Sequence, residues 1–159
     1  MSQNKKPFLN NMEGIFSAIS FGFFLLLLGI LFVSTPDLFG KISDFFTDLG
    51  IEEVSNSGVF LPAPENPQSH LALYNVMGTV SIAAVVFQAI ILALRFVISS
   101  SWSKRAETMG SFVYWIAVAF LVQWFLIDRT QWFVFWSFII MAAGVSLLVR
   151  AGVMALSKM

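Results

Sequence analysis

The sequence predicts an all-α integral membrane protein, a four-transmembrane-helix bundle with a short external amphipathic interfacial helix. Hydrophobic residues make up 58% of the 159 residues and charged residues 11%, against about 45–50% and about 25% in soluble domains. Four runs contain no Asp, Glu, Lys or Arg: 14–36, 71–94, 108–127 and 130–149. A helix needs about 20 apolar residues to cross a bilayer. Each run therefore predicts one crossing, within a single domain 1–159.

The first span is expected at about 12–34. Asn10, followed three residues later by Glu13, resembles a capping box and predicts a helix start near residue 10. Lys5 and Lys6 precede the apolar run, as in a signal peptide, but the run is longer than a typical signal core. We therefore expect an uncleaved membrane span.

An external loop is expected at 35–70, with an interfacial helix at 36–49. Apolar residues fall on one helical line and mostly acidic residues on the next: Leu38, Ile42, Phe45 and Leu49, against Asp37, Lys41, Asp44 and Asp48. Thr35 suits the N-cap, Pro36 the first helical position, and Gly50 the C-terminal stop. Such a helix either covers the outer end of the bundle or offers an acidic docking surface to a partner or cations.

The other spans are expected at about 70–99, 106–127 and 130–156. The stretch "LPAPENPQSH" precedes the second span, and "SSSWSKRAE" separates the second from the third. Only "DRT" separates the third from the fourth, so these two form a tight antiparallel pair. Small residues at helical spacing predict faces where the first and fourth spans pack closely against neighbours. These residues are Ala18, Gly22, Gly29, Ser137, Gly144 and Ala151.

The positive charges predict the orientation. One side of the predicted topology carries seven basic residues: Lys5, Lys6, Arg95, Lys104, Arg105, Arg150 and Lys158. The other side carries two, Lys41 and Arg129. Cytoplasmic loops of membrane proteins are enriched in Lys and Arg. We therefore expect a multi-pass protein of the cell membrane with cytoplasmic N- and C-termini.

Uncharged polar residues are the candidate intramembrane contacts. No Asp, Glu, Lys, Arg or His lies at mid-membrane depth in any span, whereas proton- and ion-coupled transporters usually need such a group. Asn75, Gln88 and Gln123 remain. At a rise of about 1.5 Å per residue, Asn75 and Gln123 lie at matching depth, and we expect them to share a hydrogen bond, either direct or through a third polar group. The alternative is that these amides, with serines, line a path for a small solute.

The basic residues near the inner helix ends are candidate contacts for anionic lipid or for an acidic partner. Arg95 and Arg150 are each followed by more apolar sequence, so each is expected a turn or more before its helix ends. Their long side chains can snorkel to the headgroups, which is the simpler interpretation. Together with Lys104 and Arg105 they can instead form a phosphate-binding site, which suits the planar guanidinium group.

Catalytic, cofactor and metal sites are not predicted. The chain has no cysteine, which excludes disulfides and thiol chemistry within it. Gly-x-Ser-x-Gly, His-Glu-x-x-His and phosphate-loop patterns are absent. His70 is the only histidine, and the spacing of Asp44, Asp48 and Glu52 suits at most a loose cation contact.

The expected function is therefore non-enzymatic. The leading hypothesis is an accessory or structural subunit of a membrane complex, or a self-associating bundle. The alternative is a small channel or facilitator for an uncharged solute. The expected partners are the lipid bilayer and other membrane subunits or further copies of the chain. No nucleic-acid partner and no cofactor are expected.

Overall fold

The computed structural model describes residues 5–54, 57–98 and 100–156, with side chains described from residue 14 onward. Most of these residues are helical. The elements, in chain order, are α1 (Lys5–Ser34), α2 (Leu38–Thr47), β1 (Leu49–Glu53), β2 (Phe60–Pro64), the 3-10 turn η1 (Pro67–His70), α3 (Leu71–Val97), α4 (Trp102–Leu121), the π-helical turn η2 (Val122–Ile127) and α5 (Trp132–Leu156). Within the described residues, four helical segments are long and apolar enough to cross a membrane.

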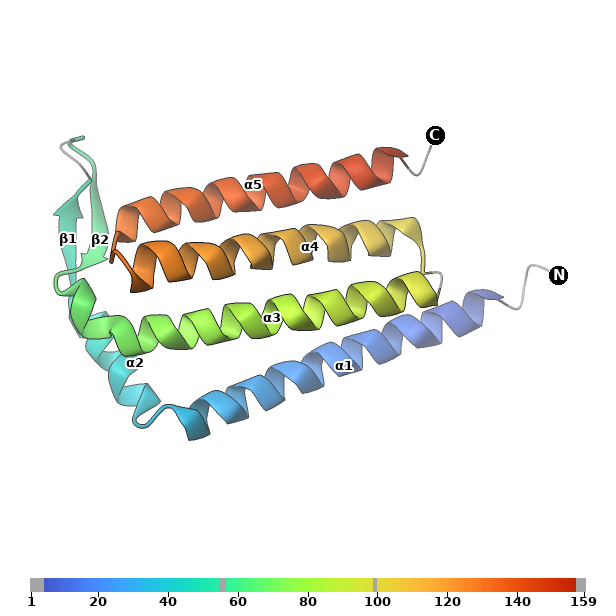
Figure 1. Cartoon of the computed structure of the whole chain (residues 1–159), viewed down its shortest axis with the longest axis horizontal. Helices are drawn as coiled ribbons and strands as arrows, with labels where there is room; N and C mark the ends of the chain where they lie inside the picture. The colour runs from blue at the N-terminus through green and yellow to red at the C-terminus, as the bar shows by residue number, and fades with distance from the viewer. Residues whose placement is uncertain (1–4, 55–56, 99, 157–159) are drawn as a thin grey trace.

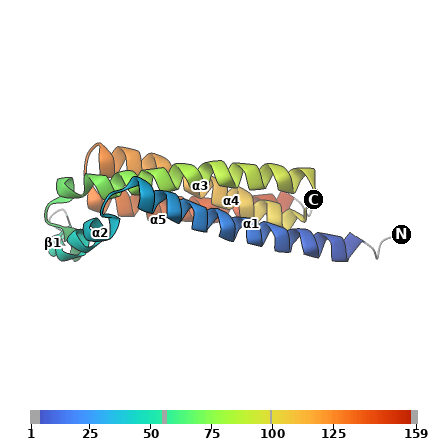
Figure 2. The same cartoon turned by 90° about the horizontal axis from the view of Figure 1, so that it is seen from below.

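The four long helices lie side by side in a row, in the order α1, α3, α4, α5 (Figure 1). Figure 2 shows the same row turned by 90°. Helix α4 packs closely against both α3 and α5, whereas α1 makes its main contact with α3. There the rings of Phe23 and Phe87 stack with their centroids 4.1 Å apart. Apolar side chains gain little from leaving lipid for a protein interior, so a row of membrane helices need not close around a common core.

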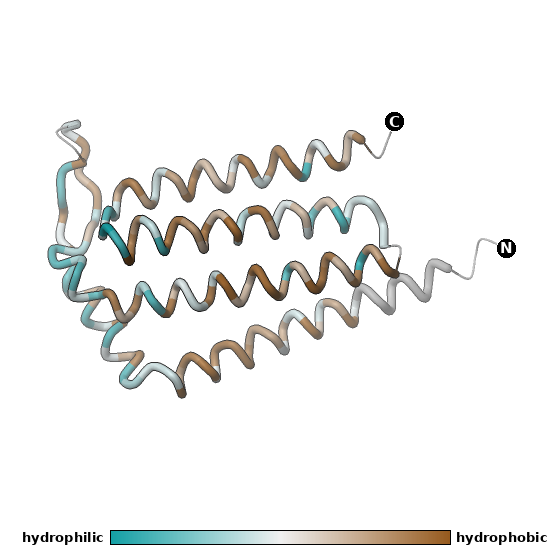
Figure 3. The backbone as a smooth tube through the Cα atoms, in the orientation of Figure 1, coloured by the Kyte–Doolittle hydropathy of each residue, from teal (hydrophilic) through white to brown (hydrophobic). Residues whose placement is uncertain are grey.

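The two ends of the row differ in character. Figure 3 shows hydrophobic residues along the four long helices and hydrophilic residues gathered around α2 and the strands. We call this the hairpin end. The opposite end, where α1 begins and α5 ends, is called the basic end because it carries Arg95, Lys104, Arg105 and Arg150.

The best-packed core lies where α3, α4, η2 and α5 meet. Its buried members are Tyr74, Val118, Leu121, Val122, Leu126, Phe135 and Ala142. Gly78 of α3 faces this cluster, where a Cβ would make ordinary contacts of 3.5 Å with Ile127 and 3.7 Å with Val122. Nearer the basic end, a Cβ on Gly110 would lie 3.0 Å from the carbonyl oxygen of Ser146. Close backbone approach at Gly110 therefore joins α4 to α5.

The small-residue faces predicted for the first and fourth spans are not packing faces within this chain. A Cβ built on Gly22, Gly29 or Gly144 meets no atom within 4 Å. The prediction was wrong because spacing shows which residues share a face, but not which face meets the neighbouring helix.

The segment between α1 and α3 is more structured than the sequence predicted. Helix α2 ends at Thr47 and its N-cap is Asp37, whose side chain accepts a bond of 3.2 Å from the Gly40 amide. The predicted helix 36–49 is therefore too long at both ends. Strand β1 follows at once and pairs antiparallel with β2, with Leu49 opposite Pro64. This hairpin was not predicted.

Two other helix boundaries also differ from the expected spans. Helix α1 begins at Lys5, so Asn10 is not its N-cap, and the side chains of the expected capping box lie outside the described residues. Helix α4 begins at Trp102, four residues before the expected span. The tight turn predicted at "DRT" is present, with Thr130 in the left-handed conformation at φ 52°.

Candidate functional site

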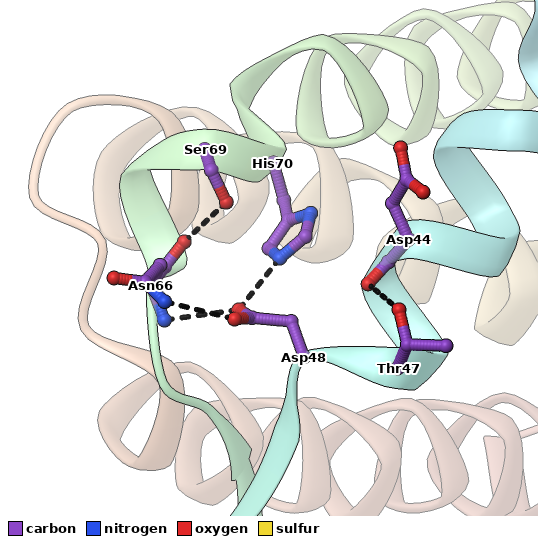
Figure 4. A network of polar contacts seen from close by, with 6 residues as sticks. All are labelled: Asp44, Thr47, Asp48, Asn66, Ser69 and His70. Carbon is purple, nitrogen blue, oxygen red and sulfur yellow. Dashed lines mark hydrogen bonds and ion pairs between the residues drawn. The ribbon is translucent and has the colours of Figure 1, made fainter.

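The clearest polar cluster lies at the hairpin end and centres on the Asp48 carboxylate (Figure 4). Asp48 Oδ2 accepts from the Asn66 amide at 2.9 Å, and Oδ1 accepts from Asn66 Nδ2 at 2.9 Å. His70 Nε2 lies 2.8 Å from Oδ2. These hydrogen bonds, from the Asn66 side chain, the Asn66 backbone and His70, hold the pKa of Asp48 below its ordinary value.

This cluster fastens α2 and β1 to the start of α3. Asp48 is the C-cap of α2, and its carbonyl oxygen accepts a bond of 2.9 Å from the Glu65 amide at the base of the hairpin. His70 is buried and lies edge-on to Phe45, with ring centroids 5.1 Å apart. Trp132 of α5 also donates to the Pro62 carbonyl at 3.1 Å. The β-hairpin is thus tied to α2, to the start of α3 and to α5.

The carboxylates and the histidine at this end do not gather beyond the pair Asp48 and His70. Across residues 5–54, 57–98 and 100–156, no three His, Asp or Glu side chains come together as possible metal ligands. The acidic row expected from Asp44, Asp48 and Glu52 does not form, since Glu52 belongs to β1. The Asp44 side chain points away from the cluster (Figure 4). Sequence reasoning missed the pairing of Asp48 with His70 because nothing local connects residues 22 positions apart.

At the basic end, Arg95 fastens α3 to the first turns of α4. Its Nη1 donates to the Lys104 carbonyl at 2.6 Å and to Thr108 Oγ1 at 2.6 Å. Its guanidinium also lies 5.6 Å from the centre of the Phe16 ring on α1. Arg95 therefore contacts the 102–108 region, as the phosphate-site hypothesis required of it.

The four basic residues do not gather into one site. The Arg105 guanidinium lies 4.9 Å from the Phe96 ring centre and 5.2 Å from that of Trp102. Lys104 pairs with Glu107, with 3.4 Å between Nζ and Oε2. Arg150 lines a groove between α4 and α5. The four candidates thus form two sets, one at the α3–α4 contact and one at the α4–α5 contact.

The predicted hydrogen bond between Asn75 and Gln123 was wrong. Asn75 Nδ2 donates to Leu71 O at 2.8 Å, and Gln123 Nε2 donates to Asp128 Oδ1 at 3.2 Å. The side chains of Asn75 and Gln123 are both exposed on the surface of the chain. Gln88 is half-buried, and within the described residues it has no hydrogen-bond partner. Matching depth along two helices does not make two side chains face each other.

Comparisons with models of protein families, with curated proteins and with solved structures find no match to this chain.

Proposed function

We propose that this chain is a four-span membrane protein that serves as a non-catalytic accessory or structural subunit, either in a membrane complex or in an assembly of its own copies. The four apolar helices support the membrane assignment. The proposal includes no enzymatic activity and no nucleic-acid partner.

The open row of helices is the main observation that supports this proposal. Helix α1 stands at one edge and leaves one face uncovered by the rest of the described chain. A surface groove of about 720 Å³ runs along that face, lined by Gly22, Leu25, Leu26, Gly29, Ile30, Val33 and Ser34. Helix α5 stands at the other edge, where Gly144 is also open. Small residues let membrane helices approach closely, so the two edges suit further helices.

The alternative function, a channel for an uncharged solute, gains no support from the polar side chains. Asn75 bonds within its own helix, and Gln123 bonds to Asp128 just beyond it. The hydroxyls of Ser20, Ser81 and Ser137 each donate to the carbonyl four residues earlier. These groups satisfy themselves locally and do not converge on a shared path.

Cross-linking from the α1 groove tests the proposal. The chain has no cysteine, so Leu26→Cys introduces a single thiol on the uncovered face, where Leu26 is 69% exposed. After labelling in native membranes with a thiol-reactive benzophenone, illumination is expected to give a discrete higher-mass product, either a dimer or an adduct with another subunit.

The matched control is Phe23→Cys on the same helix, because Phe23 stacks on Phe87 of α3. It is expected to give only products within the chain. If Leu26→Cys gives no protein adduct either, lipid covers this face and the proposal fails.

We further propose that both termini are cytoplasmic, which the charges of the two ends support. The hairpin end carries seven acidic and two basic residues. Among the described side chains, the basic end carries three arginines, one lysine and one glutamate. Lys158 is one of the seven basic residues that predict the orientation, and it lies outside the described residues.

Single cysteines test this orientation. A thiol introduced by Ser57→Cys in the β1–β2 turn is expected to react with a membrane-impermeant maleimide in intact cells. A thiol introduced by Ser103→Cys, at the start of α4, is expected to react only after the cells are opened. The opposite pattern would reverse the proposed topology.

A further inference from the structure

A groove runs between α4 and α5 from the basic end, and its lining changes from charged to apolar residues along its length. Its volume is about 390 Å³, and it is lined by Glu107, Gly110, Ser111, Tyr114, Trp115, Ala143, Ser146, Leu147 and Arg150. The helices approach closely at Gly110, where a Cβ would lie 3.4 Å from that of Arg150. The groove is therefore formed by two helices held together by backbone contact.

The lining residues change from charged to apolar with depth. Glu107 and Arg150 lie nearest the basic end, the hydroxyls of Ser111 and Tyr114 lie one to two turns deeper, and Trp115 closes the series. At a rise of 1.5 Å per residue, the distance from Glu107 to Trp115 is about 12 Å.

A second cavity continues this order toward the hairpin end. Its volume is about 260 Å³, and it shares Tyr114 and Trp115 with the groove. The rest of its lining is mostly apolar: Val76, Met77, Val80, Ser81, Val118, Phe135, Trp136 and Ile139. The whole path thus begins at one positive and one negative charge and ends among hydrocarbon and aromatic side chains.

We propose that this path binds one glycerophospholipid whose headgroup carries both a phosphate and a primary ammonium, as in phosphatidylethanolamine. The Arg150 guanidinium donates to the phosphate, and the Glu107 carboxylate accepts from the ammonium. The hydroxyls of Ser111 and Tyr114 donate to the ester carbonyls. One acyl chain then lies along Trp115 and into the second cavity.

The carboxylate at the mouth selects this headgroup over two others. Glu107 repels an anionic headgroup that brings no cation of its own, which disfavours phosphatidylglycerol. The trimethylammonium of phosphatidylcholine has no N–H to donate, so it cannot make the hydrogen bond to Glu107. Arg95 and Arg105 are not among the groove residues, so Arg150 is the guanidinium that lines the groove.

The existing partner of Glu107 leaves room for the ammonium. Lys104 approaches only one carboxylate oxygen, at 3.4 Å, and the two side chains are 45% and 47% exposed. Exposed ion pairs of this kind contribute little to stability, and an ionised carboxylate accepts several donors at once.

Lipid retention by the purified full chain tests the proposal. The chain is mixed in mild detergent with equal amounts of phosphatidylethanolamine, phosphatidylcholine and phosphatidylglycerol of identical acyl chains, and bound lipid is counted by native mass spectrometry. We expect phosphatidylethanolamine to be retained about fivefold over phosphatidylcholine, the ratio that one additional hydrogen bond gives.

Two substitutions assign this preference to the groove. Glu107→Gln is expected to bring the ethanolamine-to-choline ratio close to one. Arg150→Gln is expected to lower retention of all three lipids. Glu52→Gln and Arg129→Gln are matched controls at the hairpin end and are expected to change neither quantity. Unchanged circular dichroism and elution volume establish that each variant is folded.

Equal retention of the ethanolamine and choline lipids by the unsubstituted chain overturns the proposal without any variant. A preference that persists in Glu107→Gln also overturns it, because the ammonium is then recognised elsewhere. Strongest retention of phosphatidylglycerol, rising further in Glu107→Gln, would show that Arg150 selects an anionic lipid instead.

Discussion

Replacing Gly110 by leucine is expected to destabilise the protein strongly by separating α4 from α5. The new Cβ would lie 3.0 Å from the Ser146 carbonyl oxygen and 3.4 Å from the Arg150 Cβ. The nearest obstacle is backbone, which cannot rotate away as a side chain can. Overpacking of this kind costs about 1–3 kcal/mol, and it is expected to appear as a lower midpoint of thermal unfolding in detergent.

Gly152→Leu on α5 is the matched control, because a Cβ at Gly152 meets no atom within 4 Å. Both substitutions remove a helical glycine and so share the same gain in helix propensity. The difference between them therefore isolates the contact. If the two variants unfold at the same temperature, α4 and α5 do not meet at Gly110 as described.

Replacing Asp48 by alanine is expected to release the hairpin end from α3. The substitution removes the acceptor for the Asn66 amide, for Asn66 Nδ2 and for buried His70. Of these donors only His70 is buried, and leaving a buried polar group without its partner is costly. The segment is therefore expected to open locally. Hydrogen exchange at the Asn66 amide is expected to accelerate by about an order of magnitude, as for the loss of one hydrogen bond.

Asp44→Ala is the control for this prediction. Asp44 lies on the same helix, and its side chain points away from the cluster (Figure 4). Exchange at Asn66 is expected to stay slow in this variant. Equally fast exchange in both variants would mean that the carboxylate of Asp48 does not hold the junction.

Acid is expected to produce the same opening reversibly in the unsubstituted chain. The pKa of Asp48 is lowered in the folded state, so its contribution to stability is present above the ordinary value of 3.8. That contribution is lost as the pH falls below 3.8 and through the folded-state pKa. The NMR signal of the Asn66 amide is expected to follow this titration.

The four long helices were largely readable from the sequence because the length and apolar character of each run are local properties. Every backbone polar group in lipid must be satisfied within its own helix, so a long uncharged run is enough to predict one. The turn at "DRT" was also predictable from the sequence, because only these three residues separate two long apolar runs. The β-hairpin was missed because Leu49 and Glu52 also fit the helical pattern of the residues before them, and its partner strand begins only at Phe60.

The site residues depended on tertiary structure for a different reason. Spacing along a helix gives depth, and depth placed Asn75 and Gln123 at one level, yet the rotation of each helix turned them apart. The same rotation left Gly22 and Gly144 open and brought Gly110 against Ser146. Asp48 and His70 meet because the chain folds back between them.

The sequence by itself therefore determined four apolar helices and a strong difference in charge between their ends. Only the tertiary structure decided that the helices form an open row, that the basic residues divide into two sets, and that Glu107 and Arg150 share a groove. The physical reason is that the length and hydrophobicity of a span are local properties. Which faces meet depends instead on close packing between helices, where a single Cβ decides how near two backbones can come.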